Sequence, residues 1–257
     1  MELKGKVVVV TGAGSGIGRA CALALADQGA DIVAADGDRG RLDAVVAQLS
    51  RRGVRSIGLR TDVSKDSHVR NLARDGIAAM GQVDVLINDA SLDFDASLEQ
   101  LEMDDWERII QTNLLGVVRT ARAFAPQMVE RGGGHIISTA SFGALVPDRP
   151  ATIAYDTSKS GVIGFSQALA AALAPAGVAV SVLCYGYIRR YLDEEHWIEG
   201  VEGLTEGAET EREVSAAEIA GLVVDGLHHR RFLILSDPSG SELLAERWRH
   251  LDREAVP

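Results

Sequence analysis

Seven short apolar runs, each followed by a longer stretch with helical periodicity, constrain the fold more than any other feature of this sequence. The runs contain few polar residues, as expected of strands that are covered on both faces. They are Lys6–Val10, Asp31–Asp36, Arg55–Arg60, Val83–Asn88, Gly134–Ala140, Val178–Cys184 and Arg231–Leu235. The alternation predicts an α/β fold: a doubly wound sheet of about seven parallel strands with helices on both faces. No linker rich in Pro, Gly or Ser divides the chain, so residues 1–257 are expected to form a single domain.

Charge and cysteine content narrow the class of protein. The formal net charge is -11, which argues against a broad nucleic-acid surface or an anionic-membrane surface. The two cysteines, Cys21 and Cys184, lie far apart and lack metal-type spacing, so neither a disulfide framework nor a zinc site is expected. No apolar stretch reaches the length of a membrane span, and the N-terminus does not resemble a secretory signal. These features predict a soluble, cytoplasmic protein without a bound metal.

A glycine-rich turn joins the first predicted strand to the helical pattern that follows. The spacing is T-G-x-x-x-G-x-G, and its members are Thr11, Gly12, Ser15, Gly16, Ile17 and Gly18. Glycine allows positive φ and a close approach of the backbone to a pyrophosphate, and the N–H groups at the start of the helix favour its negative charge. The turn therefore predicts a dinucleotide-phosphate site, with glycines used only for chain reversal as the alternative.

Carboxylates follow the second and third predicted strands. Asp36 lies 18 residues after Gly18, where it can accept hydrogen bonds from a ribose diol and repel a 2′-phosphate. This predicts NAD rather than NADP, although Arg39 and Arg41 are close in sequence, and Asp36 could instead only terminate its strand. Asp62 is a candidate partner for an adenine amino group, with a helix-capping role as the alternative.

A tyrosine and a lysine share one helical face because they are spaced i, i+4. The phenol of Tyr155 has an ordinary pKa near ~10, and an ammonium group at Lys159 is expected to lower that pKa. Ser141 follows the fifth predicted strand and could hydrogen-bond the same substrate oxygen. Asn113 lies in the helix predicted over Asp104–Met128 and could hold a water that passes protons to Lys159. Taken singly, each residue could equally be an ordinary packing or surface residue.

Together with the glycine turn, these residues resemble the short-chain dehydrogenase/reductase superfamily, over roughly residues 4–235. The resemblance implies a Rossmann-type domain with Asn113, Ser141, Tyr155 and Lys159 as the catalytic tetrad. Tyr155 would be the acid/base, Ser141 would orient the substrate, and Lys159 would bind the nicotinamide ribose. The cofactor-binding positions that it implies are Gly12, Ser15, Gly16, Ile17, Gly18, Asp36, Asp62, Val63, Asn88, Ala90, Tyr155, Lys159, Gly186 and Ile188.

The sequence also departs from the pattern of this superfamily. Asp89 and Ser91 stand where the family motif N-N-A-G has its second Asn and its Gly. After the sixth predicted strand, Tyr185 replaces the usual Pro, and Arg190 replaces a Thr that commonly contacts the nicotinamide amide. Two alternatives to redox turnover therefore stay open: a dinucleotide-binding protein without activity, and a non-redox reaction such as dehydration or epimerisation on the same scaffold.

The combined signals predict an NAD(H)-dependent oxidoreductase that interconverts a small secondary alcohol and a ketone. The acidic, glycine-containing segment Tyr185–Val214 is expected to form a lid over cofactor and substrate, with a solvated surface loop as the alternative. The resemblance also implies a homodimer or homotetramer that pairs the helices Asp104–Met128 and Ala154–Leu173 with their symmetry mates. Small residues that could permit such contact are Gly116, Ala121, Gly161 and Gly164.

Overall fold

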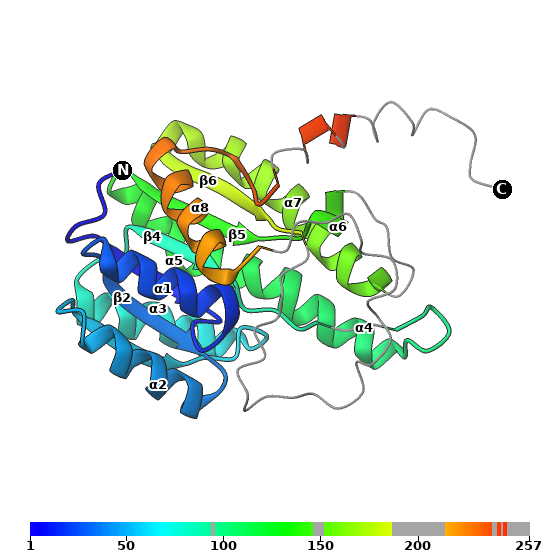
Figure 1. Cartoon of the computed structure of the whole chain (residues 1–257), viewed down its shortest axis with the longest axis horizontal. Helices are drawn as coiled ribbons and strands as arrows, with labels where there is room; N and C mark the ends of the chain where they lie inside the picture. Colours follow the sequence, from blue (N-terminus) through cyan, green and yellow to red (C-terminus); the bar gives the residue numbers. More distant parts are fainter. Residues whose placement is uncertain (94–95, 146–151, 187–213, 238–240, 243, 246–257) are drawn as a thin grey trace.

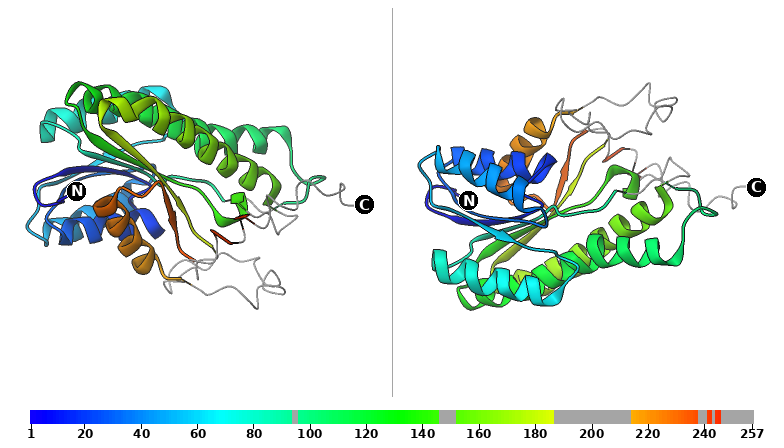
Figure 2. Two further views of the ribbon diagram at one scale, coloured as in Figure 1. Left: turned by 90° about the horizontal axis from the view of Figure 1, so that it is seen from above. Right: turned by 90° about the horizontal axis from the view of Figure 1, so that it is seen from below.

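A twisted sheet lies between two layers of helices in the computed structural model of the chain (Figures 1 and 2). The structure describes residues 1–93, 96–145, 152–186, 214–237, 241–242 and 244–245. The strands are β1 (Val7–Thr11), β2 (Asp31–Asp36), β3 (Ser56–Arg60), β4 (Val85–Asn88), β5 (Gly134–Thr139), β6 (Val178–Cys184) and β7 (Leu233–Leu235). All neighbouring strands are parallel, in the order β3-β2-β1-β4-β5-β6-β7. The predicted doubly wound sheet of seven parallel strands is confirmed.

Helices cover both faces of this sheet. On one face lie α1 (Gly16–Asp27), α2 (Arg39–Ser50) and α8 (Ala216–His229), and on the other lie α3 (Asp66–Met80), α5 (Leu115–Glu130) and α7 (Ile153–Leu173) (Figure 2). Two short helices, α4 (Met103–Ile109) and α6 (Phe142–Leu145), follow β4 and β5, and a 3-10 turn, Ala174–Ala176, precedes β6. The strand order reverses between β1 and β4, so a crevice for a ligand is expected at the carboxyl ends of these two strands.

The apolar runs are continuous because each central strand packs on both sides. In β1, Val8 and Val10 belong to the core under α1 and α8, whereas Val7 and Val9 belong to the core under α3 and α5. Successive side chains of a strand point to opposite faces. The four valines of β1, Val7–Val10, are therefore all buried, and such continuous apolar runs explain why the strands could be located from sequence.

The helix predicted over Asp104–Met128 is not continuous, which corrects that prediction. It begins at Met103 as α4, passes through a π-helical turn, Ile110–Leu114, and continues as α5. Asn113 lies in this turn and is fully buried. A π turn inserts one extra residue and so changes which side chain faces inward. Here it directs the amide of Asn113 into the protein.

Most of the predicted lid lies outside the described residues. Of Tyr185–Val214, the structure describes only Tyr185, Gly186 and Val214. The cofactor candidate Ile188 is likewise outside them. Among the described helices, none is both long and apolar enough to cross a bilayer.

Candidate active site

The glycine turn after β1 is packed so closely that larger side chains would not fit. At Gly12, where φ is 70°, a Cβ atom would lie 2.8 Å from the backbone nitrogen of Ala90. At Gly18, a Cβ atom would lie 2.3 Å from the carbonyl oxygen of Gly12. Gly16 also has a positive φ, 51°, but no described atom lies within 4 Å of its would-be Cβ. The turn is therefore tight toward the sheet and open at Gly16.

The start of α1 offers backbone donors at this opening. Its N-cap, Ser15, makes no side-chain capping bond, and its first turn contains no acidic residue. The first N–H groups of a helix have no partner within the helix and carry partial positive charge. The open space at Gly16 and the amides of Gly16 and Ile17 therefore fit the pyrophosphate of a dinucleotide.

Asp36, at the end of β2, is fixed against the same turn. Its Oδ2 accepts a hydrogen bond from the Gly14 amide at 2.9 Å, and its Oδ1 accepts one from the Asp38 amide at 2.9 Å. A Cβ atom on Gly14 would lie 2.8 Å from this Oδ2. Each carboxylate oxygen has lone pairs beyond those used here, so Asp36 can also accept from a ribose diol.

Arg39 and Arg41, the two residues that could favour NADP over NAD, both form ion pairs with aspartates. Arg39 forms an ion pair with Asp43 at 3.0 Å, and Arg41 forms one with Asp38 at 3.6 Å. All four side chains are largely exposed to solvent, where such pairs are weak. The pairs therefore do not prevent either arginine from turning toward a phosphate.

Asp62 holds a turn and does not cap a helix. Its Oδ1 accepts hydrogen bonds from both the amide and the hydroxyl of Ser64, at 2.9 and 2.6 Å. Partial burial acts to raise the pKa of Asp62, but these bonds bring it below its ordinary value. The N-cap of α3 is Lys65. The neighbouring Val63 is buried, and its side chain fills the space beside Gly116 of α5.

The segment after β4 is fastened to β1. The hydroxyl of Thr11 accepts hydrogen bonds from the amides of Asp89 and Ala90, at 3.1 and 3.3 Å. Ala90 thereby lies against Gly12.

The side chain of Asn88 serves a different connection. It accepts a hydrogen bond from the hydroxyl of Thr120 at 2.7 Å and donates one to Ser138 at 3.4 Å. Asn88 therefore ties β4 to α5 and β5.

Asp89 places a carboxyl group beside the glycine turn. A Cβ atom on Gly18 would lie 3.0 Å from its Oδ2. Burial raises the pKa of Asp89 above its ordinary value, whereas the charge of Lys159 and the amide of Gly18 act in the opposite direction. The departure from the family's Asn therefore puts a titratable group between the predicted phosphate site and the predicted catalytic lysine.

Lys159 reaches the end of β5 from α7 and is only 2% exposed. Its Nζ donates to the carbonyl oxygen of Thr139 at 3.0 Å and lies 5.4 Å from the centre of the Tyr155 ring. Burial lowers the pKa of Lys159, and the charges of Asp89 and Asp93 oppose that change. The i, i+4 spacing thus brings the predicted pair together.

The pKa of Tyr155 departs from its ordinary value in the direction opposite to the prediction. Burial raises it well above that value, and negative charge at Tyr185, Asp93 and Asp89 acts in the same direction. The prediction considered only the charge of Lys159, but desolvation disfavours a phenolate in a buried site. Tyr155 therefore keeps its proton and is suited to act as a general acid.

Ser158 connects two members of the predicted tetrad and was missed from sequence. Its hydroxyl donates to the carbonyl oxygen of Tyr155 at 2.6 Å and accepts from the amide of Asn113 at 3.1 Å. The same Asn113 amide accepts from the Leu92 backbone N–H at 2.7 Å and donates to the Leu92 carbonyl at 3.0 Å. Ser158 could have been found from its position three residues after Tyr155, which places both residues on the same helical face.

Ser141 and Gly186 complete the part of the site that the structure describes. The hydroxyl oxygen of Ser141 accepts a hydrogen bond from the Gly143 amide at 3.2 Å, which leaves its own hydrogen for another acceptor. The Gly186 amide donates to the hydroxyl of Ser236 at 2.9 Å. Among the described residues, no cluster of His, Cys, Asp and Glu could hold a metal ion.

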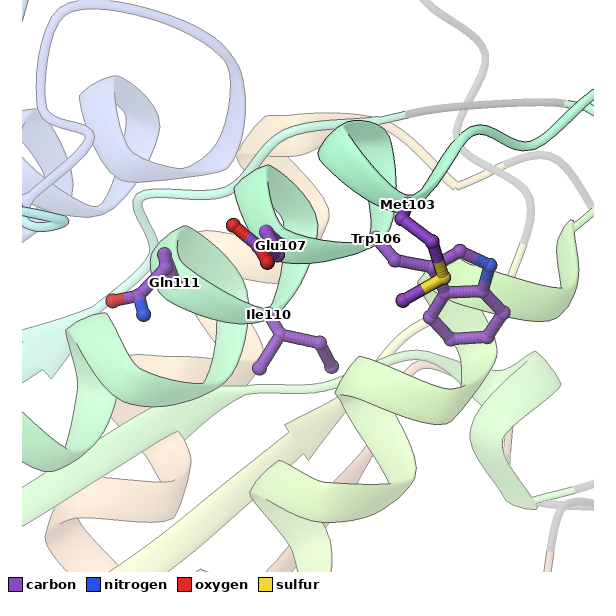
Figure 3. A pocket seen from close by; sticks show the side chains of 5 residues that line it. All are labelled: Met103, Trp106, Glu107, Ile110 and Gln111. Carbon is purple, nitrogen blue, oxygen red and sulfur yellow. The ribbon is translucent and has the colours of Figure 1, made fainter.

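An open, apolar depression of about 370 Å³ lies along α4 and the π turn (Figure 3). Its lining residues are Met103, Trp106, Glu107, Ile110 and Gln111, and they include no tetrad residue. Met103 is 71% exposed, so the depression presents a large apolar side chain to solvent.

The small residues that were expected at a subunit contact mostly face inward, which corrects that expectation. A Cβ on Gly116 would meet Val63, and one on Gly161 would meet Leu114, both at 2.8 Å, and Ala121 is 2% exposed. Only Gly164 faces open space. Small size at the other three positions is explained by packing within the chain.

Known proteins resemble this chain over most of its length. Residues 6–197 match the short chain dehydrogenase family. The chain is 34% identical to 1-deoxy-11-beta-hydroxypentalenate dehydrogenase of Streptomyces exfoliatus, over 98% of this chain and 91% of that protein. It is 35% identical to a 3-oxoacyl-(acyl-carrier-protein) reductase of Staphylococcus epidermidis, over 71% of this chain and 75% of that protein.

Solved structures extend the likeness to the fold. A short chain dehydrogenase/reductase of Burkholderia phymatum in complex with NAD has a TM-score of 0.88 and 31% identity, covering 100% of this chain and 98% of that one. A metagenomic short-chain oxidoreductase in complex with NADP has a TM-score of 0.75 and 29% identity, covering 91% of this chain and 97% of that one. The chain belongs to the short-chain dehydrogenase/reductase family of oxidoreductases.

Proposed function

We propose that this protein is an NAD(H)-dependent oxidoreductase that interconverts a secondary alcohol and a ketone, with Tyr155 as the acid/base. The observation that carries the proposal is the position of Tyr155. Lys159 lies 5.4 Å from the centre of its ring, and Ser158 joins its backbone to Asn113. This arrangement follows β5, in a sheet whose first strand ends in an open glycine turn. A proton donor beside a dinucleotide site is what carbonyl reduction requires.

The proposal assigns a role to each of the main site residues. The glycine turn and the start of α1 bind the pyrophosphate, and Asp36 binds the adenosine ribose. The nicotinamide supplies or accepts the hydride when it is bound. Ser141 donates a hydrogen bond that orients the substrate oxygen, and Tyr155 gives its proton to that oxygen. Lys159 binds the nicotinamide ribose and favours the phenolate that remains.

The preference for NAD rests on Asp36. Asp36 is 9% exposed, and its carboxylate is held by two backbone amides, so the carboxylate cannot easily move away from a 2′-phosphate. A negative charge fixed in a partly buried position disfavours a second one nearby. Related structures contain NAD or NADP, so this preference is a property proposed for this chain alone.

The reaction can be tested with a panel of ketones and alcohols. The purified protein is incubated with NADH and cyclohexanone, acetophenone or ethyl acetoacetate, and separately with NAD and the matching alcohols, while nicotinamide absorbance is followed. We expect a substrate-dependent change with at least one pair. Tight NADH binding without any change in absorbance would favour a binding protein without turnover. Loss of an alcohol without a change in absorbance would favour a non-redox reaction such as dehydration.

We also propose that the protein forms a homodimer or homotetramer through the side of the molecule that carries α4. The support is the apolar depression at Met103, Trp106 and Ile110, since contact with a second copy would remove this surface from water. The lid over Tyr185–Val214 and the cytoplasmic location stay predictions from the sequence.

A further inference from the structure

The end of β6 brings a second phenol against the first. The hydroxyl oxygens of Tyr155 and Tyr185 lie 3.3 Å apart, and either can be the donor of a hydrogen bond. The two residues come from different elements, because Tyr155 is in the first turn of α7 and Tyr185 directly follows β6. Where the family usually has proline, this chain therefore carries a group that contacts the acid/base residue.

The backbone around Tyr185 is fixed on both sides. Its carbonyl oxygen accepts a hydrogen bond from the Phe142 amide at 2.8 Å. The next residue, Gly186, donates its amide hydrogen to Ser236 at 2.9 Å. The side chain of Tyr185 also packs against the core that lies under α1 and α8. The fold therefore determines where the phenol of Tyr185 lies.

The surroundings of Tyr155 make a phenolate costly. The titratable groups that act on it are Lys159 from α7, Tyr185 from the end of β6, and Asp89 and Asp93 from the segment after β4. Burial raises the pKa of Tyr155 well above its ordinary value, and negative charge on Tyr185, Asp93 or Asp89 acts in the same direction. Tyr185 therefore opposes the phenolate when it is itself ionised, and can stabilise the phenolate only while it keeps its own proton. The ammonium group of Lys159 is hydrogen-bonded to a backbone carbonyl oxygen. A nearby hydroxyl donor would therefore have a large effect on the charged form.

Building on the proposed function, we propose that Tyr185 is a positioning residue whose hydroxyl donates to the Tyr155 oxygen when that oxygen loses its proton. In carbonyl reduction, the substrate carbon receives a hydride from the reduced nicotinamide, and the substrate oxygen receives the Tyr155 proton. The O–H bond of Tyr155 breaks, and its electron pair stays on the phenol oxygen as the negative charge. Alcohol oxidation runs through the same steps in reverse.

The direction of the effect follows from hydrogen-bond strength. Before the transfer, the contact joins two neutral phenols. After it, Tyr185 is the donor to a charged oxygen, and such bonds are roughly twice as strong as neutral ones. A protonated Tyr185 therefore stabilises the phenolate and offsets part of the cost of burial. It favours loss of the Tyr155 proton in carbonyl reduction, and it increases the fraction of phenolate that is available as the base in alcohol oxidation.

The test compares the wild-type protein with Tyr185→Phe, which removes only the hydroxyl. The assay uses the ketone of the panel that is reduced fastest, and its alcohol, across a range of pH. At a pH below the half-maximal point of the wild type, we expect kcat to fall about tenfold in both directions. We also expect the pH at which alcohol oxidation is half-maximal to rise by about one unit. NADH affinity, measured by fluorescence titration, should stay within about twofold, because the cofactor contacts are unchanged.

Ser160→Ala is the matched control. Its hydroxyl is on the same helix but donates to the Ala144 carbonyl oxygen, so kcat and the pH profile should stay as in the wild type. The inference is overturned if Tyr185→Phe leaves kcat and the pH profile unchanged, or if the profile moves to lower pH. A purely structural role would weaken NADH binding without moving the profile, which also contradicts the inference. A wild-type protein that turns over no member of the panel would instead contradict the proposed function on which the inference rests.

Discussion

His135 should make the protein lose stability as the pH falls, because it is buried in a form that cannot readily take up a proton. It lies at the start of β5 and is 0% exposed. The hydroxyl of Ser181 donates to the Arg231 carbonyl oxygen, so it accepts from Nε2 of His135 at 2.7 Å. Nδ1 then carries no hydrogen, and no described residue offers it a hydrogen-bond partner. Protonation would create a buried charge and a buried N–H without an acceptor.

The size of this loss of stability follows from the pKa of His135 in the unfolded chain and its pKa in the native protein. The pKa of His135 is lowered from 6.5 to about 4. Burial is the largest cause, and the charges of Arg230 and the N-terminus have smaller effects in the same direction. Between these values the unfolded chain binds a proton that the native protein does not, so the free energy of unfolding decreases as the pH falls through this interval. Since one pKa unit corresponds to about 1.4 kcal/mol, the loss by pH ~4 is about 3 kcal/mol.

The assay is urea unfolding followed by tryptophan fluorescence, at a fixed protein concentration and at several pH values between about 7 and 4. His135→Val removes the titrating group, so the variant should lose about 3 kcal/mol less than the wild type over this range. Carboxylates titrate in both proteins and cancel in the comparison. His228→Gln removes an exposed histidine and should leave the wild-type dependence intact. If His135→Val loses stability as steeply as the wild type, the reasoning about His135 is refuted.

Three further predictions concern the cofactor, the glycine turn and assembly. Calorimetric titration should show tighter binding of NAD than of NADP, and Asp36→Ala should narrow that difference; equal affinities in the wild type would contradict the role of Asp36. Gly12→Ala should cost about 2 kcal/mol or more in unfolding free energy and weaken NADH binding, because φ is 70° and a Cβ would lie 2.8 Å from the Ala90 nitrogen. Gly133→Ala meets no atom within 4 Å and should cost less, so equal losses would refute the packing argument. Light scattering at micromolar concentration should show an oligomer that Met103→Glu weakens, whereas a monomeric wild type would contradict the proposal.

The strands could be predicted because burial on both faces leaves a simple signature. Asp31–Asp36 and Val178–Cys184 have the predicted boundaries in the structure as β2 and β6. The other five strands differ from the prediction by one or two residues at one or both termini, since pairing at a strand end depends on neighbours that a sequence does not identify. β7, for example, begins at Leu233 and not at Arg231.

Sequence spacing predicted only those parts of the site that depend on residues close together in the chain. The i, i+4 spacing brought Lys159 to the Tyr155 ring, but spacing could not show how deeply the phenol is buried, so the predicted direction of its pKa was wrong. The π turn at Asn113 was missed because apolar periodicity does not reveal one inserted residue. The contact with Tyr185 depends on how the end of β6 approaches α7, which is a property of the folded chain.

The most direct test of the account is the turnover of Tyr155→Phe, measured with NADH and the ketone that the wild type reduces fastest. The variant keeps the ring and loses only the hydroxyl, so NADH affinity should stay within a few-fold of the wild type. Without the transferable proton, kcat should fall by about a thousandfold or more. A Tyr155→Phe protein that binds NADH normally and reduces the ketone at the wild-type rate would contradict the assignment of Tyr155 as the acid/base.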